Sequence, residues 1–123
     1  VMTRPTFNGH NASVWRRDLV RVNGFDERML YGGLDRELGE RLTNAGIFGK
    51  QIRHRAPCVH LHHERGYVTE WSWACNHKIR SETRRHRFTW TPYGIRQDAE
   101  SRCPHVAAES ELTRTPNIEN GAA

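Results

Sequence analysis

The chain has 123 residues, which is enough for one small domain. Its mean hydropathy is clearly negative, and no apolar run has the length of a membrane span or the pattern of a secretory signal. The formal net charge is +5, and the positive charge is concentrated in residues 1–96. This favours an anionic partner such as a nucleotide, a nucleic acid or an anionic lipid, without choosing among them.

Residues 1–6 are a short polar segment before the first predicted element. Residues 7–15 are expected to form a strand, or a strand and a turn, with Asn8, His10 and Asn11 clustered in it. Residues 16–22 predict a short helix, which the Asn-Gly pair after it should stop.

The segment 31–42 is the one around which we expect the rest of the chain to be organised. Its two glycines lead into a predicted helix whose apolar residues recur at helical period: Leu34, Leu38, Leu42 and Ala45. Gly46 should end this helix. Asp35 lies beside the apolar stripe, so its carboxylate is expected where the helix meets the rest of the fold. An acid in the first turn suits a site for polar ligands, and it equally suits the helix dipole alone.

Three further regions complete the predicted fold. Residues 50–61 are expected to be extended, with Pro57 at an edge or a bulge. A second long helix should follow Gly66 and dock by the side that carries Trp71. Residues 97–123 are polar and aperiodic and are expected to form a disordered tail. The fold class predicted from these elements is α/β, with a few mixed strands and two main helices.

Cysteines and histidines raise the question of a metal site. The residues concerned are Cys58, His60, His62, His63, Cys75 and His77. Their spacing matches no common structural zinc site, so a single histidine acting with ligands from elsewhere is the more plausible arrangement, beside that of ordinary surface histidines. The odd cysteine count, with Cys103 as the third, argues against a disulfide framework and for a reducing compartment.

A basic stretch with aromatic neighbours occupies residues 77–96. Such a stretch binds single-stranded nucleic acid through phosphate contacts and base stacking, or it is the solvated face of a docked helix. The solvated face is the preferred interpretation.

Several motifs, taken together, resemble a known family. They occupy residues 9–19 (Gly-His-Asn-Ala-Ser-Val-Trp-Arg-Arg-Asp-Leu), 22–27 (Val-Asn-Gly-Phe-Asp-Glu), 31–38 (Tyr-Gly-Gly-Leu-Asp-Arg-Glu-Leu) and 60–63 (His-Leu-His-His). In order and spacing they resemble the C-terminal half of a family 2 glycosyltransferase of GT-A fold, the portion shared with galactosyltransferases and chondroitin-type polymerases. The resemblance covers about residues 7–96, and it implies that residues 1–96 form the acceptor-side part of such a domain.

The resemblance implies roles for individual residues. Asp35 takes the position of the general base that acts on the acceptor hydroxyl in an inverting transfer. Gly32 and Gly33 match glycines that leave room for the sugar. His60 matches a histidine that completes the coordination of Mn²⁺ or Mg²⁺ on the nucleotide diphosphate. The other positions that it places at the substrates are His10, Asn11, Tyr31 and Glu37.

Departures from the family pattern set limits on this expectation. Tyr31 stands for a tryptophan, Leu34 for a glutamate, and Arg36 for another frequent acid. The sequence contains no Asp-x-Asp motif, which in the family holds the metal and belongs to the N-terminal half. Sugar transfer is therefore expected to need that half, in the same chain or as a separate one.

The expected reaction moves a sugar from a nucleotide donor, for example a UDP-sugar, to a saccharide or glycolipid hydroxyl. The expected place is the cytoplasm, including the inner face of the membrane, with no nucleic-acid partner. Two alternatives stay open. One is a basic module that binds single-stranded nucleic acid, and the other is a non-catalytic glycosyltransferase remnant.

Overall fold

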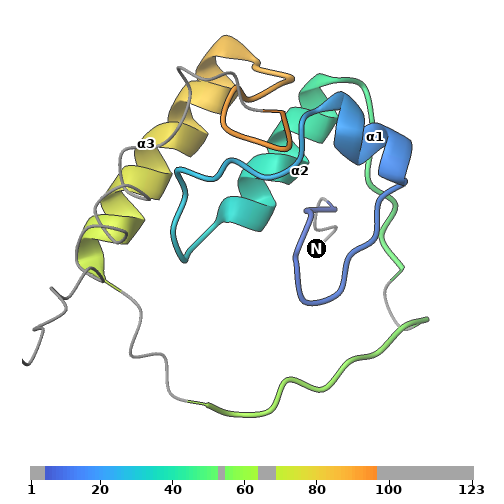
Figure 1. Ribbon diagram of the computed structural model, residues 1–123. Coiled ribbons are helices and arrows are strands. Elements are labelled where there is room, and N and C mark those ends of the chain that lie inside the picture. Colours follow the sequence, from blue (N-terminus) through green and yellow to red (C-terminus); the bar gives the residue numbers. More distant parts are fainter. Residues whose placement is uncertain (1–4, 53–54, 64–68, 97–123) are drawn as a thin grey trace, which may run out of the picture.

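The computed structural model describes residues 5–52, 55–63 and 69–96. These residues form three helices: α1 (Arg16–Arg21), α2 (Leu34–Asn44) and α3 (Glu70–His86). In Figure 1, α2 stands between α3 and α1, and α2 packs directly against α3. None of these helices is long and apolar enough to cross a membrane.

The predicted α/β fold is wrong for the part of the chain that the structure describes, because that part contains no strand. The segment 55–63 is extended as expected, but it runs as a long arc away from the helices (Figure 1). A strand requires a neighbouring strand with which it exchanges backbone hydrogen bonds, and no described segment lies there to pair with it. Residues 7–15 are likewise a loop, whose turn is closed by the Asn11 N–H donating to the Asn8 carbonyl at 3.0 Å.

Helices α1 and α2 lie where the sequence predicts them. α1 ends through Asn23 and Gly24, which both have left-handed backbone angles (φ 67° and 74°). There the Gly24 N–H donates to the Leu19 carbonyl at 2.9 Å. α2 ends at Gly46 (φ 80°), as expected for a glycine after the last helical turn.

The apolar core is small and centres on α2. Leu38 and Leu42 of the predicted stripe are buried together with Val22. Partly buried side chains from the flanking segments pack around them: Phe7, Val14, Leu19, Ala45 and Ile47. The stripe predicted from helical periodicity is therefore the one that the fold buries.

Helix α3 docks through a polar face, and the prediction that it docks by its Trp71 side is wrong. Trp71 is 55% exposed, whereas Ser72, Asn76 and Thr83 are buried. Hydrophobic periodicity located the helix but selected the wrong side, because the buried side chains Asn76 and Thr83 contact the turn before α2 and α2 itself through hydrogen bonds.

The expected disordered tail, residues 97–123, lies outside the described residues, as do residues 64–68 before α3. The proposed domain, residues 1–96, is therefore described only in part. Its helices and core all fall within that range.

Candidate functional site

The carboxylate of Asp35 is held at the start of α2 by backbone donors from two segments. The Gly9 N–H donates to Asp35 Oδ2 at 2.9 Å, and the Arg36 N–H donates to Oδ1 at 2.8 Å. Gly9 approaches so closely that a Cβ added to it would lie 3.4 Å from the Cβ of Asp35. The expectation that Asp35 lies where α2 meets the rest of the fold is confirmed.

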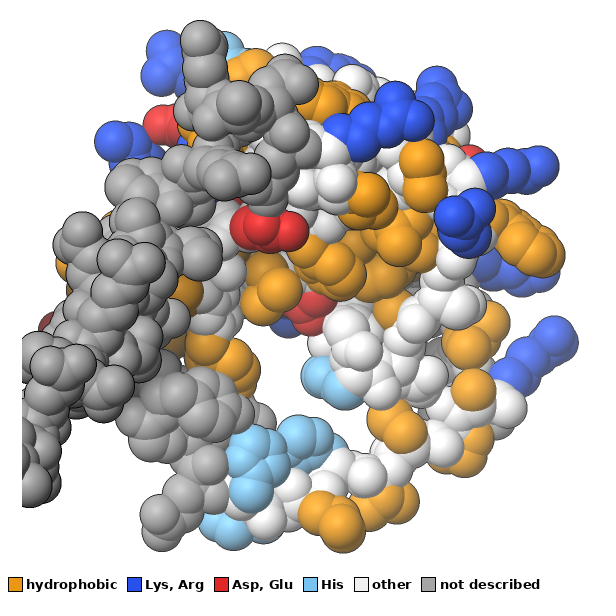
Figure 2. Space-filling view, in the orientation of Figure 1, with side chains coloured by type: hydrophobic (Ala, Val, Ile, Leu, Met, Phe, Trp, Pro, Cys, Tyr) orange, Lys and Arg blue, Asp and Glu red, His pale blue; other side chains and the backbone are white. Residues whose placement is uncertain are grey.

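The loop that holds Asp35 also contacts the extended segment. The rings of His10 and His60 lie 6.1 Å apart between centroids, and the Asn11 side chain donates to the Ala56 carbonyl at 2.7 Å. Figure 2 shows the histidine side chains gathered around the open space at this end of the molecule. The structure thus brings together Asp35, His10, Asn11 and His60, which come from three separate segments of the sequence.

The Tyr31-Gly32-Gly33 turn is positioned by α3. The Asn76 side chain donates to the carbonyls of Leu30, Tyr31 and Gly32 at 3.0, 3.1 and 2.8 Å. The two glycines have left-handed backbone angles, with φ values of 110° and 87°. Side chains of α3 lie close to the positions that their Cβ atoms would take: Trp73 is 3.3 Å away at Gly32, and Arg80 is 3.3 Å away at Gly33.

Glu37 faces a different part of the molecule. Two residues after Asp35, it is rotated by about 200° around the helix axis. Its carboxylate is 1% exposed and accepts hydrogen bonds from Arg41 (2.8 Å) and from the Thr83 hydroxyl (3.0 Å). The structure therefore does not bring Glu37 to the other residues expected at the substrates.

Arg41 is the centre of a buried network that the sequence analysis did not anticipate. Besides Glu37, its guanidinium donates to the carbonyls of Val22 and Gly24. The neighbouring Asn23 side chain donates to the Thr91 carbonyl at 2.6 Å and accepts from the Arg96 N–H at 2.8 Å. One feature of the sequence could have indicated this network: Glu37 and Arg41 are an acid and a base four residues apart, on the same side of the helix as the apolar stripe.

Asp26 closes the same network around a cavity of about 230 Å³ that is lined by residues of α2, α3 and the 88–93 segment. Burial acts to raise the pKa of Asp26, but hydrogen bonds from Arg28 and Thr91, with the Arg28 charge, outweigh it and lower this pKa overall. Burial also acts to lower the pKa of Arg28, and its bonds to Asp26 raise it overall. The Arg28 guanidinium lies 3.9 Å above the ring of Tyr93. These charges are paired internally, so the network has a structural role.

The residues that the structure describes do not by themselves form a Mn²⁺ or Mg²⁺ site. No group of three His, Cys, Asp or Glu side chains among them is arranged to hold a metal. His60 has the rings of His10 and His63 as neighbours, at 6.1 and 5.3 Å, whereas these ions prefer carboxylate oxygens. Cys58 and Cys75 are free thiols, and Cys103 lies outside the described residues.

Comparison with known proteins assigns no family to this chain. No model of a protein family, no curated protein and no solved structure matches it. Any inference about its chemistry therefore rests on its own residues and their geometry.

Proposed function

We propose that this chain is the acceptor-side part of a family 2 glycosyltransferase, which moves a sugar from a nucleotide donor such as a UDP-sugar to a saccharide or glycolipid hydroxyl. The observation that carries the proposal is the hydrogen bond from Gly9 to Asp35. It joins the motifs 9–19 and 31–38, which the resemblance expects at one site. The contact between His10 and His60 brings the motif 60–63 next to the motif 9–19.

In this proposal Asp35 is the general base. Its carboxylate accepts one backbone hydrogen bond on each oxygen, which fixes its orientation and leaves further lone pairs for an acceptor hydroxyl. As that hydroxyl attacks the anomeric carbon from the side opposite the nucleotide, its proton passes to Asp35, and the new bond has inverted configuration. A positioned base of this kind typically accelerates a reaction by about 10²–10⁴-fold.

The donor must be bound by a further half, in the same chain or as a separate one. The extended segment supports this, because its apolar side chains Val59 and Leu61 are 87% and 79% exposed. A donor-binding half that covers these side chains would also supply the acids for Mn²⁺ or Mg²⁺, with His60 as the ligand from this chain.

A glycolipid acceptor would place the protein in the cytoplasm at the inner face of the membrane. Arg16 and Arg17 are exposed on α1 beside Trp15, which is 75% exposed. Basic side chains next to a tryptophan suit the anionic headgroup region of a membrane surface.

The direct test uses the full-length product of the gene that encodes this sequence. It is incubated with UDP-sugars and a panel of saccharide and glycolipid acceptors, in Mn²⁺ and then in EDTA, and the release of UDP is followed. The proposal predicts acceptor-dependent release that needs the metal. If no nucleotide sugar is consumed but the protein binds saccharides, the non-catalytic remnant is the better description. If neither is observed, the proposal is wrong.

A second candidate, binding of single-stranded nucleic acid, is favoured by one observation. Basic side chains at the end of α3 are exposed next to Phe88 and Trp90, which are 49% and 44% exposed; these basic residues are Arg84, Arg85 and Arg87. Binding to oligonucleotides that weakens steeply with salt would support this candidate. The glycosyltransferase proposal expects only weak binding without preference for single strands.

A further inference from the structure

Trp73 occupies an unusual place for a large apolar side chain. Its indole lies against the backbone of Gly32, where an added Cβ would be 3.3 to 3.6 Å from the ring carbons Cε2, Cδ2 and Cζ2. The side chain is nevertheless 53% exposed. One part of the indole therefore rests on the turn before α2, and the remainder faces solvent.

The contacts around Trp73 fix the position of the indole relative to the start of α2. Asn76, one turn further along α3, donates to the three carbonyls of residues 30–32. Another turn further, Arg80 lies against Gly33 and pairs with Glu40 at 2.6 Å. This series of contacts along one side of α3 fixes the helix against the turn, so the indole is supported by rigid elements.

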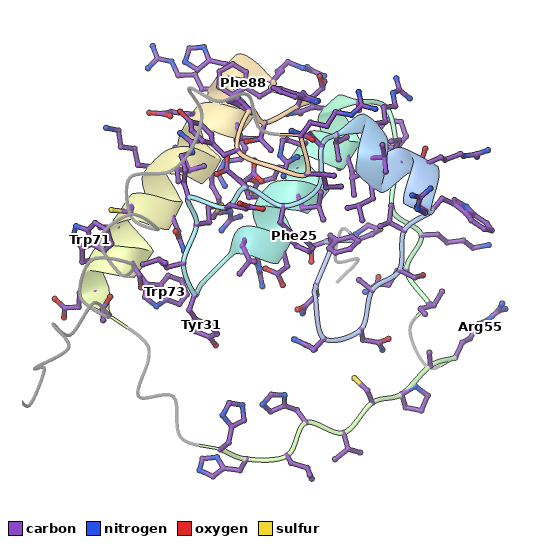
Figure 3. The ribbon with its side chains drawn as sticks, viewed as in Figure 1. Phe25, Tyr31, Arg55, Trp71, Trp73 and Phe88 are labelled. Carbon is purple, nitrogen blue, oxygen red and sulfur yellow. The ribbon has the colours of Figure 1, made fainter. Side chains whose placement is uncertain are left out.

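The indole lies against a residue that is close along the chain to Asp35, the base of the proposed function. Gly32 precedes Asp35 by three residues, and three residues span at most about 10–11 Å. In Figure 3, Trp73 and Tyr31 lie side by side at the end of α2 and α3 that borders the open space. The residue that supports the indole and the residue that carries the carboxylate are thus separated by no more than the length of about two sugar rings.

We propose that Trp73 is the platform on which a hexopyranose ring of the acceptor stacks, so that one of its hydroxyls is presented to Asp35. A pyranose ring with axial hydrogens on one side has an apolar face and a polar rim, and the indole and the carboxylate match these two parts. Gly32 is necessary because any side chain there would push the indole away. This inference rests on the proposed function and names the class of acceptor: a saccharide that ends in a hexopyranose.

The test observes each tryptophan separately in the full chain. With 5-fluorotryptophan incorporated, the ¹⁹F resonances are assigned by single Trp→Phe variants, and the chain is titrated with methyl β-D-galactopyranoside, methyl β-D-glucopyranoside and lactose. We expect the Trp73 resonance to shift with a dissociation constant on the order of millimolar. Trp73→Ala should weaken binding by at least about tenfold, as loss of a stacking surface does. Trp71→Ala removes an indole of the same helix that is exposed to a similar extent (55%) and should leave binding unchanged.

The outcomes separate this inference from the proposed function. If a saccharide binds and Asp35→Asn weakens it, while the Trp73 resonance stays fixed and Trp73→Ala binds normally, the platform is wrong and the proposed function stands. If none of the three saccharides binds, the platform and the acceptor site are both wrong. Unchanged circular dichroism of Trp73→Ala, together with retained binding by Trp73→Phe, separates loss of stacking from loss of fold.

Discussion

Two acids on the same helix, Asp35 and Glu37, have opposite surroundings. Asp35 is partly exposed and accepts hydrogen bonds from backbone N–H groups, one of them in the loop whose His10 contacts His60. Glu37 is 1% exposed, and its carboxylate is bound by Arg41 and Thr83. A partly exposed carboxylate with free lone pairs is available for chemistry, whereas a buried, fully paired one stabilises the fold. The resemblance treats both as substrate residues, and their geometry separates them.

The largest effect should come from breaking the buried pair. Glu37→Gln leaves the Arg41 guanidinium buried without its counter-charge, so we expect the free energy of unfolding to fall by about 3–5 kcal/mol. Glu40→Gln is a matched control on the same helix, because its partners Arg80 and Arg84 are partly exposed, and it should cost about 0–1 kcal/mol. Urea unfolding followed by circular dichroism measures both. Equal losses would mean that Glu37 is not the structural acid.

A smaller loss is expected where α3 holds the glycine turn. Asn76→Ala removes the donor to the carbonyls of residues 30–32, so we expect a loss of about 1–3 kcal/mol from the unsatisfied carbonyls. His77→Ala, at the next and exposed position, should change stability by less than about 0.5 kcal/mol. Urea unfolding followed by circular dichroism measures both losses. If Asn76→Ala were as stable as His77→Ala, the hydrogen bonds from α3 would not be needed to hold the turn.

The pH dependence of stability should reveal the network around Asp26. Its pKa is lower in the folded chain than the value of about 3.9 in an unfolded one. The ionised form therefore contributes stability above the unfolded pKa, and this contribution is lost as the pH falls through the folded pKa. Asp26→Asn should consequently destabilise the chain at pH 7 and lose much of that effect at pH 3. The exposed Glu70→Gln is the control, and a penalty for Asp26→Asn that does not change with pH would contradict the assignment.

Predictions from the sequence succeeded where local chemistry decides the structure. α1 and α2 end at left-handed glycine or asparagine residues, and the stripe containing Leu38 and Leu42 is buried. They failed where the result depends on partners that are distant in sequence. The segment 55–63 is extended but forms no strand, since no described segment pairs with it. The docked side of α3 is polar, so its apolar pattern was misleading.

The sequence predicted which residues belong to the candidate site better than it predicted how they are arranged. His10, Asn11, Asp35 and His60 were named from motifs, and the structure brings the three segments that carry them into contact. The contact of Trp73 with the glycine turn could not be predicted, because nothing in the local sequence shows that α3 lies against Gly32. Long-range packing of this kind becomes visible only in three dimensions.

The most direct test of the proposed role of Asp35 is the turnover of Asp35→Asn in the full-length gene product, measured as acceptor-dependent release of UDP. Asp18→Asn, which removes an acid from the first turn of α1, is the control for charge and folding. We predict that Asp35→Asn loses at least about 100-fold in turnover while its unfolding transition stays within a few degrees of that of the control. Turnover equal to that of Asp18→Asn would contradict the role of Asp35 as the base.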